Sequence, residues 1–341
     1  MQSDAQAARP LGPYLIFLGD VTEPAYAKTA FGVRDWARDR CIGEFALPDA
    51  TVTTGLRHLE PDEAYAHGAR ALLIGVATPG VLIPPHWLPT LERALEARLD
   101  IVSGMHAKLN DIAQLAEAAR LFGRRLIDLR VPPADIPVAS GRSRSGRRLL
   151  TVGTDCALGK KYTALAIARG LAARGLDVDF RATGQTGIMI AGAGIPIDAV
   201  VSDFISGAAE LLSPDAAPDH LDVIEGQGSL FHPAYAAVSL GLLHGSQPDL
   251  FVVCHDPARR TVLGYPEFTL PSIDQVIEQT VAMGRITSPA IRCCGISLNT
   301  FAFDDPAAAK VIAETEQRIG LPVADPVRKI GLEQLLDACA G

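Results

Sequence analysis

The stretch 149–163 reads LLTVGTDCALGKKYT and decides how the second half of this 341-residue chain folds. It runs from an apolar, β-prone segment through a loop bounded by Gly153 and Gly159 into a segment with helical spacing. Apolar residues within 164–171 continue that spacing, and Gly175 is suited to end the helix. A loop of this kind wraps backbone N–H groups round a phosphate, and the helix N-terminus favours negative charge. The order of strand, glycine loop and helix therefore predicts a phosphate site.

The residue after the loop lysine determines what such a loop can do with a phosphate. Lys160 would reach the phosphate oxygens as a point charge. A loop that hydrolyses nucleotides has Ser or Thr next, because that hydroxyl holds Mg²⁺. Lys161 stands there instead, so we expect a phosphorylated cofactor to be bound rather than split, with no essential metal. The residues expected to hold it are Gly153, Thr154, Asp155, Cys156, Ala157, Gly159, Lys160, Lys161 and Tyr162.

Composition narrows the class of protein. Because 48% of residues are hydrophobic and 21% are charged, we expect a compact globular chain, long enough for two domains. A net charge of −8 disfavours a nucleic-acid surface. The six cysteines show no C-x-x-C or zinc spacing, which is typical of buried thiols in a reducing cytosol.

The sequence pattern also predicts neither a signal peptide nor a membrane-spanning segment. Residues 1–6 are polar, without the apolar core of a signal peptide, and no apolar run reaches the ~18 residues of a membrane span. We therefore expect a cytoplasmic protein with small-molecule substrates and no nucleic-acid or membrane partner. We also expect a homo-oligomer, although residues alone leave the number of subunits open.

The first part of the chain alternates apolar runs with helical patterns. The runs are 14–18, 71–76, 100–102 and 126–129, and the helical patterns are 25–38, 87–98 and 111–122. Alternation of this kind predicts a doubly wound parallel α/β sheet. No G-x-G-x-x-G follows the first run, so the dinucleotide fingerprint is absent. We expect a Rossmann-like domain at 1–135.

A break in composition separates this part from the phosphate loop. Residues 131–148 are rich in Pro, Gly, Ser and Arg and almost free of apolar residues, which is typical of a solvated surface linker. We expect the linker at 136–148 and a P-loop NTPase-like α/β domain at 149–341.

Polar residues follow every predicted strand of the second domain. The segments concerned are 183–187 (TGQTG), 225–229 (EGQGS), 255–257 (HDP), 299–300 (NT) and 325–328 (DPVR). Because the carboxyl ends of parallel strands share one sheet edge, these segments should lie beside the phosphate loop. This edge is the predicted active site.

Three residues are candidates for catalysis. Glu225 follows an apolar strand, where an acid could hold Mg²⁺ or a water, or accept a proton. The alternative is that it braces backbone amides of the adjoining glycine turn. His244 and His255, near predicted strand ends or glycine turns, could titrate near neutrality and act as base, unless they are merely hydrogen-bonded.

The remaining candidates would bind substrate. Arg181 and Arg328 sit at strand ends and could clamp a carboxylate, with surface ion pairs as the alternative. The full predicted set is Arg181, Gln185, Gln227, Ser229 and Arg328.

These motifs together resemble one bacterial and archaeal family. The matching segments are 153–161, 183–187, 225–233 (EGQGSLFHP), 240–249 (LGLLHGSQPD) and 17–20 (FLGD), so the resemblance covers nearly the whole chain. The family was long catalogued only as a domain of unknown function and includes D-glutamate N-acetyltransferases. It implies a Rossmann-like domain followed by a P-loop domain. It also implies acetyl transfer from acetyl-CoA to the amine of D-glutamate, as the start of D-glutamate catabolism.

The resemblance suggests a direct transfer, and it has rivals. A base would take a proton from the substrate ammonium, the amine would attack the thioester, and backbone N–H groups would stabilise the oxyanion. Glu225 is the first choice of base, then His244 or His255. The P-loop half is also similar to dethiobiotin synthetase, which keeps Thr where this chain has Lys161. Two alternatives therefore stay open. One is an ATP- and Mg²⁺-dependent ligase or kinase, and the other is a non-catalytic nucleotide-binding regulator.

Overall fold

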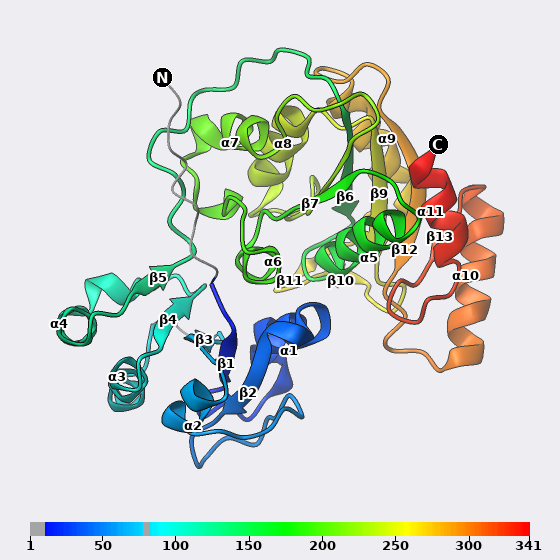
Figure 1. Cartoon of the computed structure of the whole chain (residues 1–341). Coiled ribbons are helices and arrows are strands. Elements are labelled where there is room, and N and C mark those ends of the chain that lie inside the picture. Colours follow the sequence, from blue (N-terminus) through cyan, green and yellow to red (C-terminus); the bar gives the residue numbers. More distant parts are fainter. Residues whose placement is uncertain (1–10, 78–81) are drawn as a thin grey trace. The chain divides into compact units, whose positions relative to one another are not determined.

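A computed structural model of the chain describes residues 11–77 and 82–341, and it separates into two compact units (Figure 1). The first unit comprises the described residues up to Val131 together with Ile188–Gly192. The second comprises Pro132–Gly187 and Ala193–Gly341. The predicted lack of a signal peptide concerns residues 1–6, which lie outside the described residues. Within those residues, no helix combines the length and apolar character needed to cross a membrane.

The described residues of the first unit form a five-stranded parallel sheet in the order β2-β1-β3-β4-β5. Its strands are β1 (Tyr14–Phe17), β2 (Cys41–Phe45), β3 (Ala71–Ile74), β4 (Asp100–Ser103) and β5 (Leu126–Asp128). Its helices are α1 (Lys28–Trp36), α2 (Pro61–Ala66), α3 (Leu88–Glu96) and α4 (Ala113–Phe122). Strands β1, β3 and β4 are buried throughout, as in a parallel sheet covered on both faces. The predicted doubly wound architecture is confirmed.

Strand β2 and helix α2 were not predicted from the sequence. The strand reads CIGEF, and its Glu44 breaks the apolar pattern that marks a buried strand. The carboxylate is nevertheless buried, because it accepts the backbone N–H of Thr54 at 2.7 Å and the hydroxyls of Thr53 and Thr54. Such a satisfied buried acid cannot be recognised from local sequence.

The described residues of the second unit form a six-stranded parallel sheet in the order β13-β12-β9-β6-β8-β7. Its strands are β6 (Arg147–Gly153), β7 (Val178–Arg181), β8 (Leu221–Ile224), β9 (Leu250–His255), β12 (Arg292–Leu298) and β13 (Val323–Ala324). Its helices are α5 (Lys160–Ala173), α7 (Ile205–Leu212), α8 (Ala236–Ser246), α9 (Ile273–Gly284), α10 (Asp305–Ile319) and α11 (Leu332–Ala340). Helix α6 (Gln185–Ala191) begins in this unit, and its residues from Ile188 on belong to the first. Every strand predicted here is present.

Side chains of alternating residues divide the core of the second unit into two layers. Leu149, Val223 and Val252 pack with residues of α5 and α11 on one face of the sheet. Leu150 and Val253, each next in sequence to one of them, pack with α7, α8 and α9 on the other face. The two-residue period of a strand produces this division, and it places helices on both faces.

A short antiparallel hairpin lies outside the main sheet and was not predicted. It pairs β10 (Thr261–Val262) with β11 (Tyr265–Thr269), and Gly264, with a φ of 83°, makes the turn possible. Proline within β11 and the short strand length hide it from a search for apolar alternation. This hairpin matters for the site described below.

The segment 131–148 was predicted to be solvated, and this is wrong for two of its arginines. The side chain of Arg144 is 5% exposed, and it donates to the Ser213 hydroxyl and to the Gly245 carbonyl, at the ends of α7 and α8. Arg148 is buried and donates to backbone carbonyls, including Ser145 at 2.7 Å. The last carbonyls of a helix need donors from outside the helix, which a guanidinium can supply.

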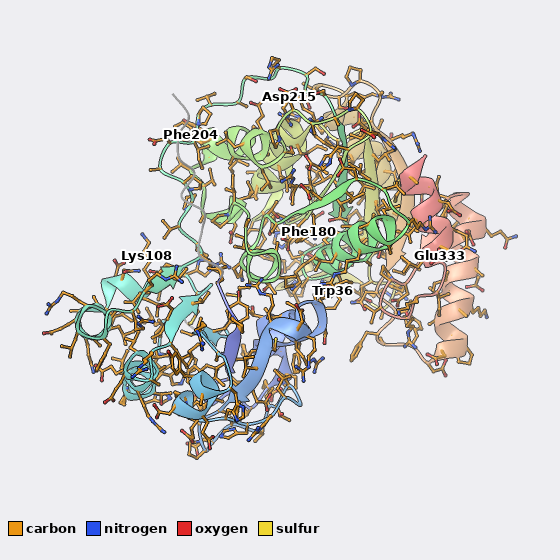
Figure 2. All side chains as sticks on the ribbon, viewed as in Figure 1. Trp36, Lys108, Phe180, Phe204, Asp215 and Glu333 are labelled. Carbon is orange, nitrogen blue, oxygen red and sulfur yellow. The ribbon has the colours of Figure 1, made fainter. Side chains whose placement is uncertain are left out.

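An acidic residue on the loop before β8 further fixes this segment. Asp215, labelled in Figure 2, accepts the Ser145 backbone N–H at 2.9 Å and pairs with Arg142 at 2.6 Å. Residues 132–148 are therefore an integral part of the second unit.

Candidate active site

The predicted phosphate loop, residues 153–159, turns sharply between β6 and α5. Ala157 and Gly159 adopt positive φ angles of 53° and 106°. The Thr163 N–H bonds to the Gly159 carbonyl, so α5 starts at the loop and the first N–H groups of its backbone lie at the loop. The geometry is that of an anion-binding helix N-terminus.

Lys160 already points into this loop. Its side chain is buried, and Nζ donates to the Asp155 carbonyl at 2.7 Å. Burial lowers the pKa of Lys160, because a charged ammonium is costly away from water. An anion bound in the loop would offset that cost.

Asp155 is a structural anchor of the loop. It has no exposed surface, and Oδ1 accepts the backbone N–H of Cys156 at 2.6 Å. Oδ2 accepts the Leu263 N–H of the hairpin and Nη1 of Arg259, each at 2.8 Å. Arg259 also donates to the Cys156 carbonyl at 2.8 Å. The hairpin segment is thereby tied to the loop.

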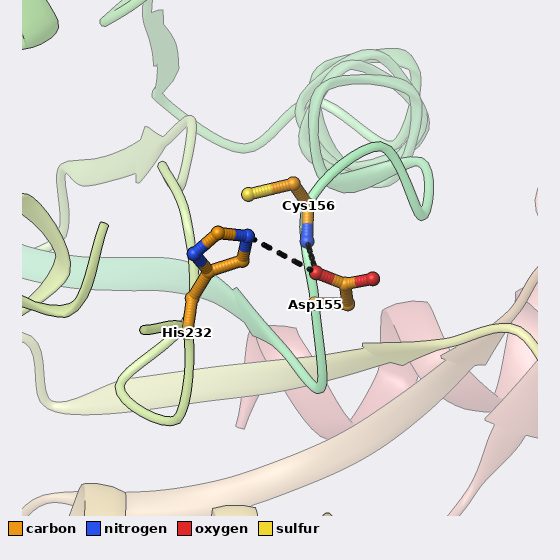
Figure 3. A group of neighbouring side chains, drawn as sticks. All are labelled: Asp155, Cys156 and His232. Atoms are coloured by element: carbon orange, nitrogen blue, oxygen red, sulfur yellow. Dashed lines mark hydrogen bonds and ion pairs between the residues drawn. The ribbon is translucent and has the colours of Figure 1, made fainter. Parts of the chain in front are cut away.

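His232 lies beside Asp155 and Cys156, as Figure 3 shows. Its Nδ1 accepts the backbone N–H groups of Ala234 at 3.1 Å and Tyr235 at 3.3 Å. Nδ1 therefore carries a lone pair, and the proton of the neutral ring resides on Nε2. Nε2 lies 3.8 Å from Asp155 Oδ1. Burial lowers the pKa of His232, which favours this neutral form.

The tautomer of His232 determines whether the cluster of Asp155, Cys156 and His232 can bind a metal ion or an anion. The ligand atoms of Asp155, Cys156 and His232 lie within 4.8 Å of one another, close enough to hold a metal ion. A metal at Nε2 would require the proton on Nδ1, where two backbone N–H groups already donate. Nε2 is consequently a donor toward the loop, which suits an anion and suits neither a metal nor proton abstraction.

Glu225 directly follows the last residue of β8. Its Oε2 accepts the N–H groups of Thr183 at 3.0 Å and Gly184 at 3.1 Å. Burial raises the pKa of this carboxyl, against the charge of Lys161 and the two N–H groups. The sequence left open that Glu225 braces backbone amides of a glycine turn, and the structure shows this contact with the turn at 183–187.

Close backbone approach explains the glycines of the two motifs. A Cβ on Gly187 would lie 2.2 Å from Glu225 Oε2, and one on Gly226 would lie 1.6 Å from the Thr151 carbonyl oxygen. A side chain at position 187 would displace the Glu225 carboxylate, and one at position 226 would require the β6 backbone to move.

Several other predicted residues gather at this edge. Gln227 donates to the Thr183 hydroxyl at 2.9 Å, and His255 Nδ1 lies 3.0 Å from the Thr154 hydroxyl. Burial lowers the pKa of His255. The Ser229 hydroxyl accepts the Phe231 N–H at 3.2 Å.

Two further residues adjoin the same region through their chain positions. Gln185 is the first residue of α6, so the glycine turn at 183–187 is partly helical. Lys161 lies in the first turn of α5, with Nζ 5.4 Å from the centroid of the Tyr162 ring.

The sequence predicts His244 near a strand end or a glycine turn, and the structure does not bear this out. His244 occupies the last turn of α8, and Nε2 lies 3.1 Å from the Met283 carbonyl oxygen of α9. The Gly-rich segment 240–249 reads as a turn but is mostly helical, since its apolar residues pack against α7 and the sheet.

Both predicted clamp arginines are already paired. Arg181 Nε donates to Asp222 at 2.6 Å, and its Nη2 lies 3.0 Å from Asp179. Arg328 pairs with Asp305 and donates to the Phe303 carbonyl at 2.6 Å. Binding of a substrate carboxylate by either arginine would require an exchange of partners.

Sequence reasoning missed Arg259 and His232 as members of this site. Arg259 reaches Asp155 across 104 residues of chain, which no local pattern can indicate. His232 lies inside the recognised segment 225–233, so its place near the loop could have been inferred. The backbone N–H groups of Ala234 and Tyr235, which follow it in sequence, donate to its ring nitrogen Nδ1.

Two family models match the chain. A domain of unknown function described as a Rossmann-like domain (DUF1611_N) matches residues 49–132, and one described as a P-loop domain (DUF1611_C) matches residues 137–336. The chain belongs to the DUF1611 family.

Relatives of this family match along almost the whole chain. A D-glutamate N-acetyltransferase from Tritonibacter scottomollicae is 44% identical over 96% of this chain and 98% of its own length. One of the same name from Pseudoalteromonas sp is 44% identical over 93% of this chain and 95% of its own length. The crystal structure of a DUF1611 protein from Anabaena variabilis superposes with a TM-score of 0.85 at 32% identity, covering 95% of this chain and 98% of that one.

Proposed function

We propose that this protein is an N-acetyltransferase that moves the acetyl group of acetyl-CoA to the amino group of D-glutamate, opening D-glutamate catabolism. The observation that carries the proposal is the name shared by two relatives that are 44% identical along nearly the whole chain. The phosphate loop supports it, because Lys161 stands where a nucleotide-splitting loop has its metal-binding hydroxyl.

The loop would hold the pyrophosphate of acetyl-CoA. Its donors are the N-terminal N–H groups of α5, the ammonium groups of Lys160 and Lys161, and Nε2–H of His232. With these cations present, Mg²⁺ is not needed to neutralise the phosphates. No bond to phosphorus breaks in acetyl transfer, so the loop binds and positions without catalysing.

The length of the cofactor then constrains where acetyl transfer occurs. About twelve bonds separate the pyrophosphate of CoA from its sulfur, as many as in four amino acid residues, which extend over about 13–14 Å. His255 Nδ1 lies 3.0 Å from the hydroxyl of Thr154 in the loop, and Glu225 is close enough to Lys161, in the first turn of α5, for that charge to act on the pKa of its carboxyl. A loop filled by pyrophosphate therefore leaves them too close to act as base at an extended thioester, and we assign them to cofactor binding and loop support.

The transfer itself needs no covalent enzyme intermediate. The neutral amine attacks the thioester carbon, the C–S bond of the tetrahedral intermediate breaks, and the CoA thiolate leaves. The proton lost by the amine balances the charge of that thiolate. Cys156 lies in the loop with its thiol pKa raised by burial, so it is not poised as a nucleophile.

One assay tests the proposal against its rivals. Purified protein is incubated with acetyl-CoA and a panel of D- and L-amino acids while thiol release is followed. Release that depends on D-glutamate supports the proposal, and release with another amine reassigns the substrate. ATP hydrolysis without thiol release would instead identify a ligase or kinase, and nucleotide binding without any turnover would identify a regulator.

A further inference from the structure

A run of aromatic side chains starts at the phosphate loop. The His232 ring stacks on Tyr235, with centroids 4.5 Å apart, and meets the edge of Tyr265 at 5.2 Å. Tyr265 in turn meets Phe268 edge-on at 6.2 Å. We call these four rings the aromatic track. They join the segment before α8 to strand β11 of the hairpin.

The hydrogen bonds of Asp155 fix the track relative to the loop. Asp155 holds the Leu263 N–H at 2.8 Å, and Val262 pairs with Tyr265 across the hairpin. Tyr235 is held in turn by His232, whose Nδ1 accepts the Tyr235 backbone N–H at 3.3 Å. The track therefore begins at a defined place beside the loop.

Exposure increases along the track. His232 is 2% exposed, whereas Phe268 is 48% and Tyr235 is 51% exposed. Leu263, at the hairpin turn, adds a further half-exposed apolar side chain. Large apolar side chains grouped on a surface are typical of a binding site.

We propose that the aromatic track binds the pantetheine arm of acetyl-CoA, an inference that rests on the proposed function. The ring-to-ring steps of 5.2 Å and 6.2 Å carry the track outward over a distance comparable with the arm's about 13–14 Å. The arm has apolar segments between its two amides, which pack well on aromatic faces and edges. The edge-on rings suit such a chain better than a flat purine, which needs one broad stacking face.

The inference places the thioester toward the Phe268 end of the track. Acetyl transfer then takes place away from Glu225 and the phosphate loop. The half-exposed rings would also shield the bound thioester from water on one side.

Binding measurements with the two halves of the cofactor test this assignment. Phe268→Ala and Tyr235→Ala are each compared with wild type for affinity toward acetyl-CoA and toward 3′-phospho-ADP, which lacks the arm. We expect each variant to bind acetyl-CoA about tenfold more weakly and 3′-phospho-ADP as well as wild type does. Phe268→Leu, which keeps an apolar side chain, should recover most of the affinity.

Phe301 provides a matched control. It is an aromatic side chain of the same unit, 91% exposed, in the loop after β12. Phe301→Ala should leave both affinities unchanged.

Three results would overturn the inference: unchanged acetyl-CoA affinity in both track variants, equal weakening of both ligands, or the loss appearing only in Phe301→Ala. Equal weakening would assign the track to the nucleotide half instead. These failures leave D-glutamate acetylation by wild type intact, whereas wild type that binds neither ligand overturns the proposed function together with the inference.

Discussion

Two edges of the six-stranded sheet both bury charged side chains, yet they differ in what those side chains contact. At the phosphate-loop edge, Lys160 contacts a backbone carbonyl, and Glu225 contacts backbone N–H groups of a glycine turn. At the opposite edge, His220 lies between two carboxylates, Asp177 at 2.9 Å and Asp222 at 3.1 Å. There the chain supplies the counter-charges itself.

The difference shows why a buried charge alone does not identify a binding site. Arg181 turns back toward Asp179 and Asp222, so its charge is neutralised within the sheet. Around Lys160, by contrast, glycines such as Gly226 let the backbone approach closely, and the helix N-terminus adds further donors. We expect substitutions at the opposite edge to lower stability and substitutions at the loop edge to lower affinity.

The largest effect is expected from Arg148→Ala at the opposite edge. Its guanidinium is buried and donates to the carbonyls of Arg144, Ser145, Gly146 and Pro214, so its loss leaves these acceptors without a donor and removes a positive charge near Asp222 and Asp249. The free energy of unfolding should fall by about 3–5 kcal/mol. Urea denaturation of the second unit measures this, with Arg142→Ala, an exposed partner of Asp215, as a control expected to cost under about 1 kcal/mol. A loss below that of the control would contradict the contrast between the edges.

The phosphate loop itself was predictable because its signals are local. Strand, glycines, lysine and helix follow one another within 149–163, and the backbone geometry depends on them directly. The same holds for β1 and β3, whose uninterrupted apolar runs indicate burial on both faces.

The rest depends on partners that are distant in sequence. Arg144 looked solvated because nothing near it reveals that the ends of α7 and α8 meet it. His244 read as a turn residue, because glycine and histidine lower helix propensity, and tertiary packing of α8 overrode that preference. Arg259 was overlooked for the same reason, since its partner Asp155 lies in another part of the chain.

Lys160→Ala tests the loop edge and should affect affinity more than stability. Each charge-assisted hydrogen bond to phosphate is worth about 1.5–3 kcal/mol, so acetyl-CoA should bind roughly ten- to a hundredfold more weakly. The free energy of unfolding should not fall, because the burial that lowers the pKa of Lys160 also makes its charge costly. Calorimetric titration and urea denaturation of the same sample give both quantities. Unchanged affinity would mean that the loop does not hold the phosphates.

Lys161→Thr should have a smaller effect and one that depends on metal. The change removes the cation that opposes the raised pKa of Glu225 and restores the hydroxyl of a metal-dependent loop. Without Mg²⁺ we expect acetyl-CoA affinity to fall about two- to fivefold, as for a partly exposed charge. Added Mg²⁺ should then restore part of it or introduce ATP binding. Titrations at several Mg²⁺ concentrations decide this, and Lys161→Met, which lacks the hydroxyl, should show the loss without the recovery.

The smallest effect is a pH dependence at the opposite edge. Burial lowers the pKa of His220, but its hydrogen bonds to Asp177 and Asp222 outweigh burial and raise the pKa above its ordinary value. The folded state therefore binds the imidazole proton more tightly than the unfolded chain does. The resulting stabilisation is complete below about pH 6.5 and is lost as the pH rises through the raised pKa of His220. Between those values the wild-type free energy of unfolding should decline with pH, the decline should vanish in His220→Asn, and it should weaken in Asp177→Asn. Parallel pH profiles for all three proteins would show that His220 is not held as a cation, and the contrast with the phosphate-loop edge would then rest on Arg148 alone.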